Sequence, residues 1–312
     1  MSETRGGESA SHTDSSRNDG DTDRAPAAPM VEPGAHLAPG YRVVARLRRG
    51  HRMDVYDLWS EERSCRCVGK TVRPERAADE SAIAPLRTEA MLLTSLTHPH
   101  LVRGYGTVLA TDPLRPVVVT ETLPGHTLGY LVAEHERLAP ADVALLGVQL
   151  CSVLGHLHRQ GWVHLDVKPS NVVVAGGRAI LLDLSLTCRI GEASSSGTFD
   201  YLAPEQARGD EMTATVDTWG LGLTLYEAIS GTTPWAGVSH RERHDDGTRR
   251  HPQRDSTVVP LGRHRELPAE PAATIDACLA PEPSDRPRTD EVSERLVTWS
   301  GIDPAAAGDT DE

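Results

Sequence analysis

The hydrophobic pattern of this chain is mainly that of strands before about residue 124 and mainly that of helices after it, and this order limits the folds open to it. Before that point, apolar and β-branched residues form short runs that predict strands at 41–47, 53–59, 65–72 and 117–122. One stretch in this part, 81–96, has helical spacing instead. The first part of the chain is therefore predicted to be mainly β-sheet with one helix.

After residue 124 the apolar residues recur mostly at the spacing of helices. The predicted helices lie at 140–160, about 215–230, 275–279 and 292–296. Two β-branched pieces, 171–174 and 179–182, are joined by Gly176-Gly177 and predict a hairpin. The whole layout predicts an α+β fold, with a small β-rich part followed by a larger α-helical part.

Both ends of the chain lack the residues that build a core. Residues 1–40 are rich in Ser, Gly, Asp, Pro and Ala and contain no aromatic residue. A segment of this composition cannot bury enough apolar surface to offset the entropy lost on ordering. We therefore expect residues 1–40 and 302–312 to be disordered, and the polar, His- and Arg-rich stretch 238–255 to be an exposed loop.

The charge balance disfavours nucleic acid as a partner. The chain has 45 Asp and Glu residues against 32 Lys and Arg residues, a formal net charge of −13, whereas nucleic-acid-binding domains are usually basic. No window offers about 18 uninterrupted apolar residues, so we expect no membrane span. The start of the chain lacks the basic and apolar regions of a signal peptide. With five scattered cysteines, which predict reduced thiols, these features predict a cytoplasmic protein.

Lysine is almost absent from this sequence. Of the 32 basic residues only Lys70 and Lys168 are lysine, and the other 30 are arginine. Ammonium and guanidinium groups are not interchangeable at a crowded site. The two lysines therefore invite a chemical explanation, and the alternative is that two surface lysines were retained by chance.

Lys168 lies in the most informative segment of the sequence, residues 163–171. Asp166, Lys168 and Asn171 stand here within six positions, between a predicted helix and a predicted strand, so their side chains can converge. Asp166 can accept a proton from an incoming hydroxyl. Lys168 can neutralise a transferring phosphoryl group, and Asn171 can hold a hard cation through its carbonyl oxygen. Asp183 follows the second strand of the predicted hairpin and is placed to bind a metal ion.

These motifs, taken in order along the chain, resemble those of the bacterial eukaryotic-type serine/threonine protein kinases. Beside the segment 163–171, the resemblance rests on Cys67-Val68-Gly69-Lys70, Arg87-Thr88-Glu89-Ala90, the stretch from Gly197 to Glu205, Asp217 and Asp285-Arg286-Pro287. It covers about residues 41–299. It implies a two-lobed protein kinase fold, with a small β-rich N-lobe and hinge at 41–123 and a larger α-helical C-lobe at 124–301.

The resemblance also implies a role for each matching residue, with ATP and Mg²⁺ as cofactors. Catalysis is assigned to Asp166, as the base, and to Lys168 and Asn171. Magnesium binding is assigned to Asn171 and Asp183. ATP binding is assigned to Gly50, Val55, Val68, Lys70, Glu89, Glu121 and Leu123. Structural support is assigned to Thr198, Glu205, Asp217 and Arg286.

The glycine-rich loop of the family is eroded in this chain. Only Gly50 remains where three glycines are usual, and Arg48 and Met53 stand at the other two positions. Side chains there obstruct the approach of backbone amides to phosphate. We therefore expect weak nucleotide binding, unless Arg48 or Arg52 contacts phosphate directly. Val68, which stands where alanine is usual, narrows the adenine pocket.

Two further departures concern the loops around the site. Leu165 replaces the arginine that usually precedes the base and helps to bind a phosphate on the activation loop. We therefore expect activity that does not depend on phosphorylation of that loop. The Asp-Phe-Gly of the family is Asp183-Leu184-Ser185 here. Leu184 can fill an apolar slot, whereas Ser185 lacks the conformational freedom of glycine.

Three functions remain open for these residues. We expect a serine/threonine protein kinase that transfers the γ-phosphate of ATP to a Ser or Thr hydroxyl of a protein, because every polar catalytic group is present. The alternative is a pseudokinase or ATP-binding regulatory module, which the eroded glycine loop favours. A small-molecule phosphotransferase of related fold is disfavoured by Lys168 and by the segment 197–205, which resembles a peptide-docking floor. The expected partners are protein substrates and a soluble regulatory protein.

Overall fold

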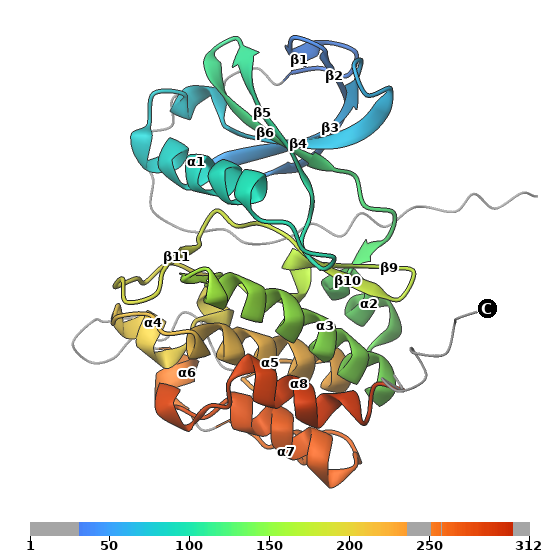
Figure 1. The fold of residues 1–312 in the computed structure, drawn as a ribbon, viewed down its shortest axis with the longest axis vertical. Helices are drawn as coiled ribbons and strands as arrows, with labels where there is room; N and C mark the ends of the chain where they lie inside the picture. Colours follow the sequence, from blue (N-terminus) through green and yellow to red (C-terminus); the bar gives the residue numbers. More distant parts are fainter. Residues whose placement is uncertain (1–30, 236–250, 257, 302–312) are drawn as a thin grey trace, which may run out of the picture. The chain divides into compact units, whose positions relative to one another are not determined.

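The computed structural model describes residues 31–235, 251–256 and 258–301, which form two lobes (Figure 1). The first lobe is a six-stranded antiparallel sheet with the strand order β1-β2-β3-β4-β6-β5. Its elements are β1 (His36–Ala38), β2 (Tyr41–Arg49), β3 (Met53–Ser60), β4 (Cys65–Val72), α1 (Glu80–Ser95), β5 (Gly104–Thr111) and β6 (Leu114–Glu121). Helix α1 packs against β4, β5 and β6. The four predicted strands and the predicted helix are confirmed.

Strand β4 shows how the sequence pattern sets the two faces of this sheet. Cys67, Gly69 and Thr71 are buried on one face. Val68 and Lys70 alternate with them and project from the other face, where they line a cavity. The alternation therefore gives one face to the core and the other to a binding site.

The prediction of disorder up to residue 40 is wrong for residues 31–40. Strand β1 pairs with β2, and its residues Leu37 and Ala38 are buried in the cluster that also holds Tyr41. Two apolar residues are too short a run to predict a strand, but the unpaired edge of β2 supplies its hydrogen-bond partners. The ordered first lobe therefore begins before residue 41.

The second lobe is mainly helical. Its helices are α2 (Leu128–His135), α3 (Pro140–Arg159), α4 (Pro204–Arg208), α5 (Thr215–Ser230), α6 (Pro252–Asp255), α7 (Ala269–Cys278) and α8 (Thr289–Val297). Its short strands are β7 (His126–Thr127), β8 (Trp162–Val163), β9 (Val172–Ala175), β10 (Arg178–Leu181) and β11 (Cys188–Arg189). They form the sheets β10-β9-β7 and β11-β8. Single turns of 3₁₀-helix lie at Pro74–Arg76, Pro169–Asn171, Phe199–Tyr201, Leu261–Arg263 and Pro283–Asp285.

Helix α5 forms the centre of the second lobe and has the predicted bounds. Nearly all of its residues are buried, including the polar Asp217 and Thr224. A helix that is buried on all sides belongs in the middle of a core. It ends at Gly231, whose φ of 79° lies in the left-handed region that favours glycine at a helix C-terminus.

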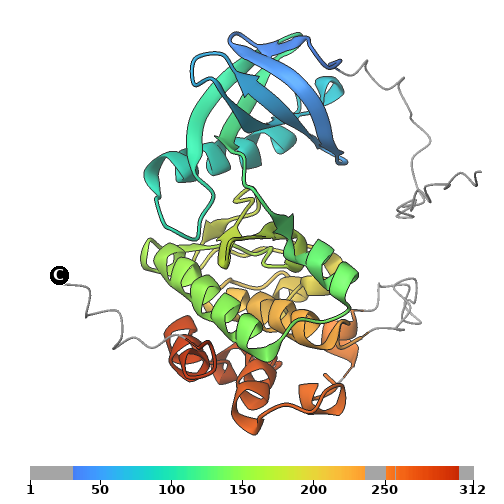
Figure 2. The same cartoon turned by 90° about the vertical axis from the view of Figure 1, so that its right-hand side faces the viewer.

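One continuous hydrophobic cluster joins the two lobes. It contains Leu86 of α1 and Val118 of β6 in the first lobe, and Leu154 of α3 and Leu181 of β10 in the second. The chain passes from β6 to β7 and α2 through residues 122–125, the interlobe linker (Figure 2). The shared cluster fixes the two lobes against each other beside the cavity described below.

The expectation of an exposed loop over 238–255 is wrong for its end. Pro252–Asp255 form α6, and Pro252 and Gln253 are buried. The Gln253 amide donates to the backbone oxygen of Phe199, which ties α6 to the second lobe. The rest of that prediction, over residues 236–250, lies outside the described residues, as do the predictions for residues 1–30 and 302–312.

The structure bears on two expectations drawn from composition, the reduced cysteines and the absence of a membrane span. All five cysteines are unpaired. Among the residues that the structure describes, one helix, α3, is long and apolar enough to cross a membrane by length and composition. Half of that apolar stretch is buried, and α3 packs against α5 and α8, as the core helix of a lobe does.

Candidate active site

A cavity of about 430 Å³ lies between the sheet of the first lobe and the second lobe. Strands β2, β3 and β4 and the interlobe linker form one side of it, and residues from 170 to 183 form the other. All the residues predicted to bind ATP line this cavity except Gly50. Asn171 and Asp183, which were predicted to bind a metal ion, also line it. The structure thus brings together residues that are up to 136 positions apart in the chain, from Leu47 to Asp183.

Strand register places Arg48, Val55 and Lys70 side by side on the cavity face. Arg48 pairs with Val55, and Val55 pairs with Lys70. Side chains of paired residues project to the same face of a sheet, and all three line the cavity. The Arg48 side chain is exposed and forms no hydrogen bond or ion pair with another described residue. The position of a family glycine therefore holds a cation on the cavity face.

Gly50 lies in the tight turn between β2 and β3, beyond the cavity wall. Its N–H donates to the backbone oxygen of Met53 at 2.8 Å. A Cβ atom at residue 50 would lie 3.2 Å from that same oxygen. The remaining glycine of the loop therefore serves the turn itself in this structure.

The end of β6, where the interlobe linker begins, is anchored to the chain just before β5. The N–H of Glu121 donates to the backbone oxygen of Arg103 at 3.0 Å, and its carboxylate accepts from the N–H of Arg103 at 2.9 Å. The predicted adenine contact from Glu121 is therefore limited to its carbonyl oxygen. Leu123 follows and lines the cavity with Val55 and Val68, which gives this end an apolar wall.

Lys70 is the centre of a charge network at the inner end of the cavity. Its ammonium group forms an ion pair with Glu89 of α1 at 2.9 Å and donates to Asp183 Oδ1 at 2.5 Å. The Lys70 side chain is 15% exposed and that of Glu89 4%. Burial acts to lower the pKa of Lys70, but the two carboxylates outweigh it and raise that pKa. Lys70 therefore stays protonated and joins the two lobes.

Asp183 is held with its carboxylate toward the cavity. Its φ of 60° lies in the left-handed region, and both the N–H and the hydroxyl of Ser185 donate to Oδ1, at 3.1 and 2.6 Å. Burial acts to raise the pKa of Asp183, but Lys70 and Ser185 outweigh it and hold the pKa below its ordinary value. Asp183 is therefore ionised. Between these two residues Leu184 is fully buried, which confirms that it fills an apolar slot.

The oxygen atoms of Asp183 and Asn171 fit a magnesium ion. Asn171 uses its Nδ2 to donate to Asp166, so its carbonyl oxygen remains available. Magnesium is usually held by one or two carboxylates together with substrate phosphates, and it needs no all-protein cage. No group of three or more potential His, Cys, Asp or Glu ligands occurs within the described ranges. This donor set suits a hard cation that arrives with a phosphate.

The Asp166 carboxylate accepts hydrogen bonds from three neighbouring side chains. Lys168 Nζ and Asn171 Nδ2 donate to Oδ2, at 2.7 and 2.8 Å. The hydroxyl and the N–H of Thr198 donate to Oδ1, at 2.7 and 3.1 Å. Lys168 also donates to the Thr198 hydroxyl. Thr198, 30 residues beyond Lys168 in the chain, thus joins the predicted catalytic group.

Asp217 fixes the backbone in front of Asp166. From within α5, its carboxylate accepts the N–H groups of His164 and Leu165, at 2.8 and 2.9 Å, and faces His158 Nε2 at 2.8 Å. Burial acts to raise the pKa of Asp217, but His158 and the backbone N–H of His164 outweigh it and lower that pKa. An ionised carboxylate therefore holds the turn, and Leu165 sits in it with a φ of 67°.

Glu205 and Arg286 form a buried, two-pronged ion pair. Arg286 Nη1 and Nη2 donate to the two carboxylate oxygens of Glu205, at 2.6 and 2.8 Å. The other guanidinium hydrogens are taken by the backbone oxygens of Ala280, Thr215 and Pro281. A buried charge pair of this kind is tolerated because every donor has a partner. This ion pair holds α4 against the rest of the second lobe. The segment that precedes α4 and carries Thr198 is held with it.

Sequence reasoning missed two residues that shape this site. Ser185 was judged only by the flexibility it lacks, although Asp-x-Ser is a local hydrogen-bonding pattern that could have revealed its bonds to Asp183. Gln206, beside Glu205, carried no signal at all. Its contacts reach back to the chain around Leu165, 41 residues away.

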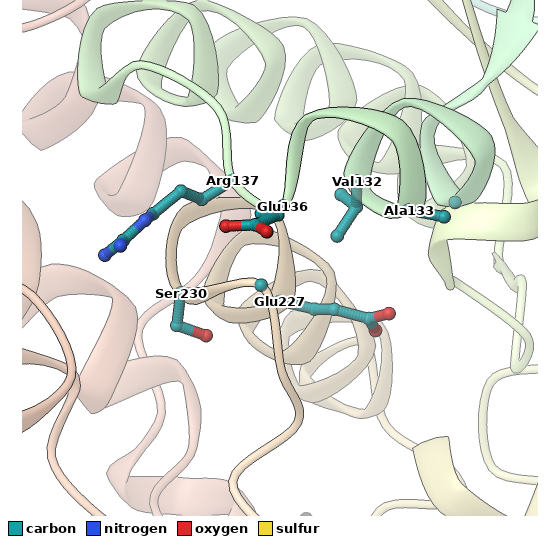
Figure 3. Close-up of a pocket in the computed structure, with 8 residues that line it drawn as sticks. Val132, Ala133, Glu136, Arg137, Glu227 and Ser230 are labelled. Carbon is teal, nitrogen blue, oxygen red and sulfur yellow. The ribbon is translucent and has the colours of Figure 1, made fainter.

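A second hollow of about 560 Å³ lies between the end of α2 and the end of α5. Figure 3 shows Val132 and Glu136 on the α2 side of this hollow and Glu227 on the α5 side. Glu227 also accepts from the hydroxyl of Tyr201, and burial raises the pKa of this carboxyl. None of the predicted site residues lines this hollow. Apart from Gly50, the predicted ATP and metal residues line the cavity between the lobes instead. Asp166, Lys168 and Thr198 do not line it, and Asn171 joins them to it through its hydrogen bond to Asp166.

The protein kinase domain family matches residues 41–297 of this chain. The chain is 31% identical, over 270 residues, to the serine/threonine-protein kinase PknB of Mycobacterium tuberculosis. That alignment covers 82% of this chain and 42% of the relative. It is also 31% identical, over 245 residues, to the serine/threonine-protein kinase PkaA of Streptomyces coelicolor, with 75% of this chain and 43% of the relative covered. The match thus spans less than half the length of these relatives.

A solved structure has the same fold. The PknI kinase domain of Mycobacterium tuberculosis superposes with a TM-score of 0.66 at 21% sequence identity. The superposition covers 86% of this chain and 100% of that domain. The predicted two-lobed architecture is therefore confirmed.

Proposed function

Because the chain belongs to the protein kinase domain family, we propose that it is a serine/threonine protein kinase that transfers the γ-phosphate of ATP to a protein hydroxyl. One observation carries this proposal. Asp166, Lys168 and Thr198 form a single hydrogen-bonded group, which Asn171 connects to the cavity. Asn171 lines the same cavity as Lys70 and Asp183, which supports a base and two cations acting at one inter-lobe site.

In this mechanism Asp166 acts on the acceptor. Its carboxylate takes the proton of the Ser or Thr hydroxyl as that oxygen attacks the terminal phosphorus. The donors from Asn171 and Thr198 fix the direction of the carboxylate, so it loses little freedom when the acceptor binds. Asp217 contributes by holding the turn that carries Asp166.

The two lysines act on the phosphates. Lys70, held by Glu89 and Asp183, binds the phosphates that stay on the nucleotide. Lys168 lies beside Asp166 and stabilises the charge on the transferring group. Asp183 and the carbonyl of Asn171 would hold Mg²⁺, which supplies further charge neutralisation at the phosphates when bound.

A pseudokinase is the second candidate, and Arg48 is the observation that favours it. Its side chain lines the cavity in the row that also holds Val55 and Lys70. A side chain there displaces either the ribose or the phosphates unless it binds one of them. The competing observation is that all the polar groups of the catalytic cluster are present and bonded to one another.

A transfer assay separates the two candidates. The purified chain is incubated with labelled ATP, Mg²⁺ and a generic basic protein, and the product is tested for phosphoserine, phosphothreonine and phosphotyrosine. Asp166→Asn should lower the rate by at least about 10²-fold, the usual contribution of a positioned base. Asp142→Asn, an exposed carboxylate at the start of α3, is the matched control and should be neutral.

Each outcome of that assay decides something. Phosphoserine or phosphothreonine that depends on Asp166 supports the kinase. Calorimetric binding of ATP–Mg²⁺ without any transfer supports the pseudokinase. Transfer that survives Asp166→Asn unchanged contradicts the assigned site.

A further inference from the structure

Gln206 of α4 is a buried amide whose hydrogen-bonding groups are all in use. Its side chain is 2% exposed. Nε2 donates to the backbone oxygen of Leu165 at 3.0 Å and to that of Ser196 at 2.7 Å. Oε1 accepts the N–H of Ala203 at 2.9 Å. The amide orientation is unambiguous, because two carbonyl oxygens can only accept and a backbone N–H can only donate.

The first of these bonds stabilises the backbone immediately before the base. Leu165 has a φ of 67°, a conformation that costs energy for a side chain with a Cβ atom. Its N–H is held by Asp217 at 2.9 Å and its C=O by Gln206. The peptide groups on both sides of Leu165 are thus fixed from different elements, and this sets the direction in which Asp166 leaves the turn.

The second bond controls the segment that brings Thr198 to Asp166. Ser196 accepts from Gln206, and Thr198 donates to the Asp166 carboxylate two residues later. Between them Gly197 has a φ of 150°, and a Cβ atom there would lie 3.0 Å from the Gln206 amide nitrogen. Glycine at 197 therefore permits the close approach that the Gln206 bond needs.

The loop before this point is held without any charged contact to the base. It pairs with residues 210–212 through backbone hydrogen bonds, including Gly191 N–H to the oxygen of Met212 and Met212 N–H to the oxygen of Glu192, both 2.8 Å. In kinases with an arginine before the base, a loop phosphate supplies the coupling between the two loops. Leu165 is buried and uncharged, so it cannot do this.

We propose that Gln206 is the positioning residue that couples the catalytic loop to the loop carrying Thr198, in place of a phosphate and arginine pair. The proposal rests on the proposed kinase function. It assigns to one neutral amide the task of holding Asp166 and Thr198 in register, so the site is assembled in the unphosphorylated chain.

The test replaces Gln206 by leucine, which keeps the bulk and removes all three hydrogen bonds. Gln206→Leu should lower kcat by about tenfold or more, the equivalent of at least one lost buried hydrogen bond. The Kd for ATP should stay within about twofold, because Gln206 does not line the nucleotide cavity. Gln149→Leu is the matched control, since Gln149 also bridges two backbone groups, Gly177 O and Ala179 N, and none of these three residues lines the cavity.

A second variant provides a signature that loss of packing cannot produce. In Gln206→Glu an ionised carboxylate faces two carbonyl oxygens and donates nothing, whereas the protonated acid donates one hydrogen bond. The rate of this variant relative to wild type should therefore rise as the pH falls. Gln206→Glu also keeps the test valid if Gln206→Leu fails to fold.

Hydrogen exchange separates this proposal from the proposed function. Amide exchange of residues 189–198 should become about tenfold faster in Gln206→Leu and stay unchanged in Gln149→Leu, whether or not the chain transfers phosphate. If the wild type transfers no phosphate but the variants show this exchange pattern, the kinase function is overturned and the coupling by Gln206 is retained. A folded Gln206→Leu with wild-type kcat and wild-type exchange overturns the coupling.

Discussion

Replacing Lys70 by methionine should affect both catalysis and stability, and the structure gives the size of each effect. Methionine keeps the length of the side chain but leaves Glu89 and Asp183 side by side without a cation. Breaking a buried ion pair by removing one partner costs about 3–5 kcal/mol. Because the Lys70 side chain is still 15% exposed at the cavity, we expect the lower end, about 3 kcal/mol. The rate should fall by at least about 10²-fold, because a preorganised cation at the developing charge is lost.

The stability loss should depend on pH in a defined direction. In the wild type the pKa of Asp183 is lowered, so its contribution is present above the ordinary pKa of aspartate and is lost as the pH falls below it. In Lys70→Met the cation that opposes burial is lost, so the pKa values of Glu89 and Asp183 both rise. The folded variant then binds more protons than the unfolded chain, and its stability falls as the pH rises. The gap between variant and wild type is therefore largest near neutral pH and shrinks toward pH ~5.

Urea unfolding at neutral pH and at pH ~5, together with the transfer assay, measures both effects. A loss of about 3 kcal/mol moves the unfolding midpoint by about 1 M urea. Arg87→Met is the matched control, because it removes an exposed ion pair with Glu80 on α1 and should cost no more than about 0.5 kcal/mol. If Lys70→Met has the same stability gap at both pH values, or keeps the wild-type transfer rate, the reasoning about this network is refuted.

Three further predictions follow from the cavity, the loop and the first strand. Arg48→Gln should weaken ATP binding by about tenfold and leave adenosine binding unchanged in calorimetric titrations, because a charge-assisted hydrogen bond contributes about 1.5 kcal/mol; a gain in ATP affinity would show that Arg48 obstructs the phosphates. Alanine at each of the serines 194–196 should leave the rate on a separate peptide within about tenfold, because Leu165 carries no charge to read a phosphate; a larger loss, matched by phosphatase-treated wild type, would mean that another cation does so. A chain that begins at Val31 should match the full-length rate, whereas one that begins at Tyr41 lacks β1 and should melt at a lower temperature; equal melting temperatures would contradict the packing of β1.

The hydrophobic pattern of the sequence predicted the helices and strands whose own residues favour that structure. The bounds of β4 and α5 match the expectation, because buried and less buried residues alternate along most of β4, and α5 is mostly apolar and is followed by Gly231. Strand β5 and helix α2 were not predicted. Strand β5 has little alternation and is held by its long pairing with β6, and α2 is only eight residues long.

For the site, contacts between residues close together in the sequence were predicted from the residues themselves, and contacts between distant residues were not. Asp166, Lys168 and Asn171 lie within one segment, and their convergence followed from the sequence. The contact between Lys70 and Asp183 joins residues 113 positions apart, and only the family resemblance indicated it. Gln206 has no motif of its own, since its role arises from backbone oxygens that folding brings to it. A hydrogen bond from a side chain to a backbone oxygen places no requirement on the side chain of the accepting residue. The sequence therefore shows no motif for it.

The scarcity of lysine allows a direct measurement of where the phosphates of ATP bind. An ATP analogue with an acyl group on its terminal phosphate transfers that acyl group to a neighbouring lysine amine, and ATP is the leaving group. The chain has only two lysines, Lys70 and Lys168, so mass spectrometry after digestion identifies the neighbour unambiguously. We predict acylation of one or both lysines, abolished by excess ATP–Mg²⁺. Absence of the label from both lysines, or a label that excess ATP does not prevent, would contradict the assignment of this cavity as the site of phosphoryl transfer.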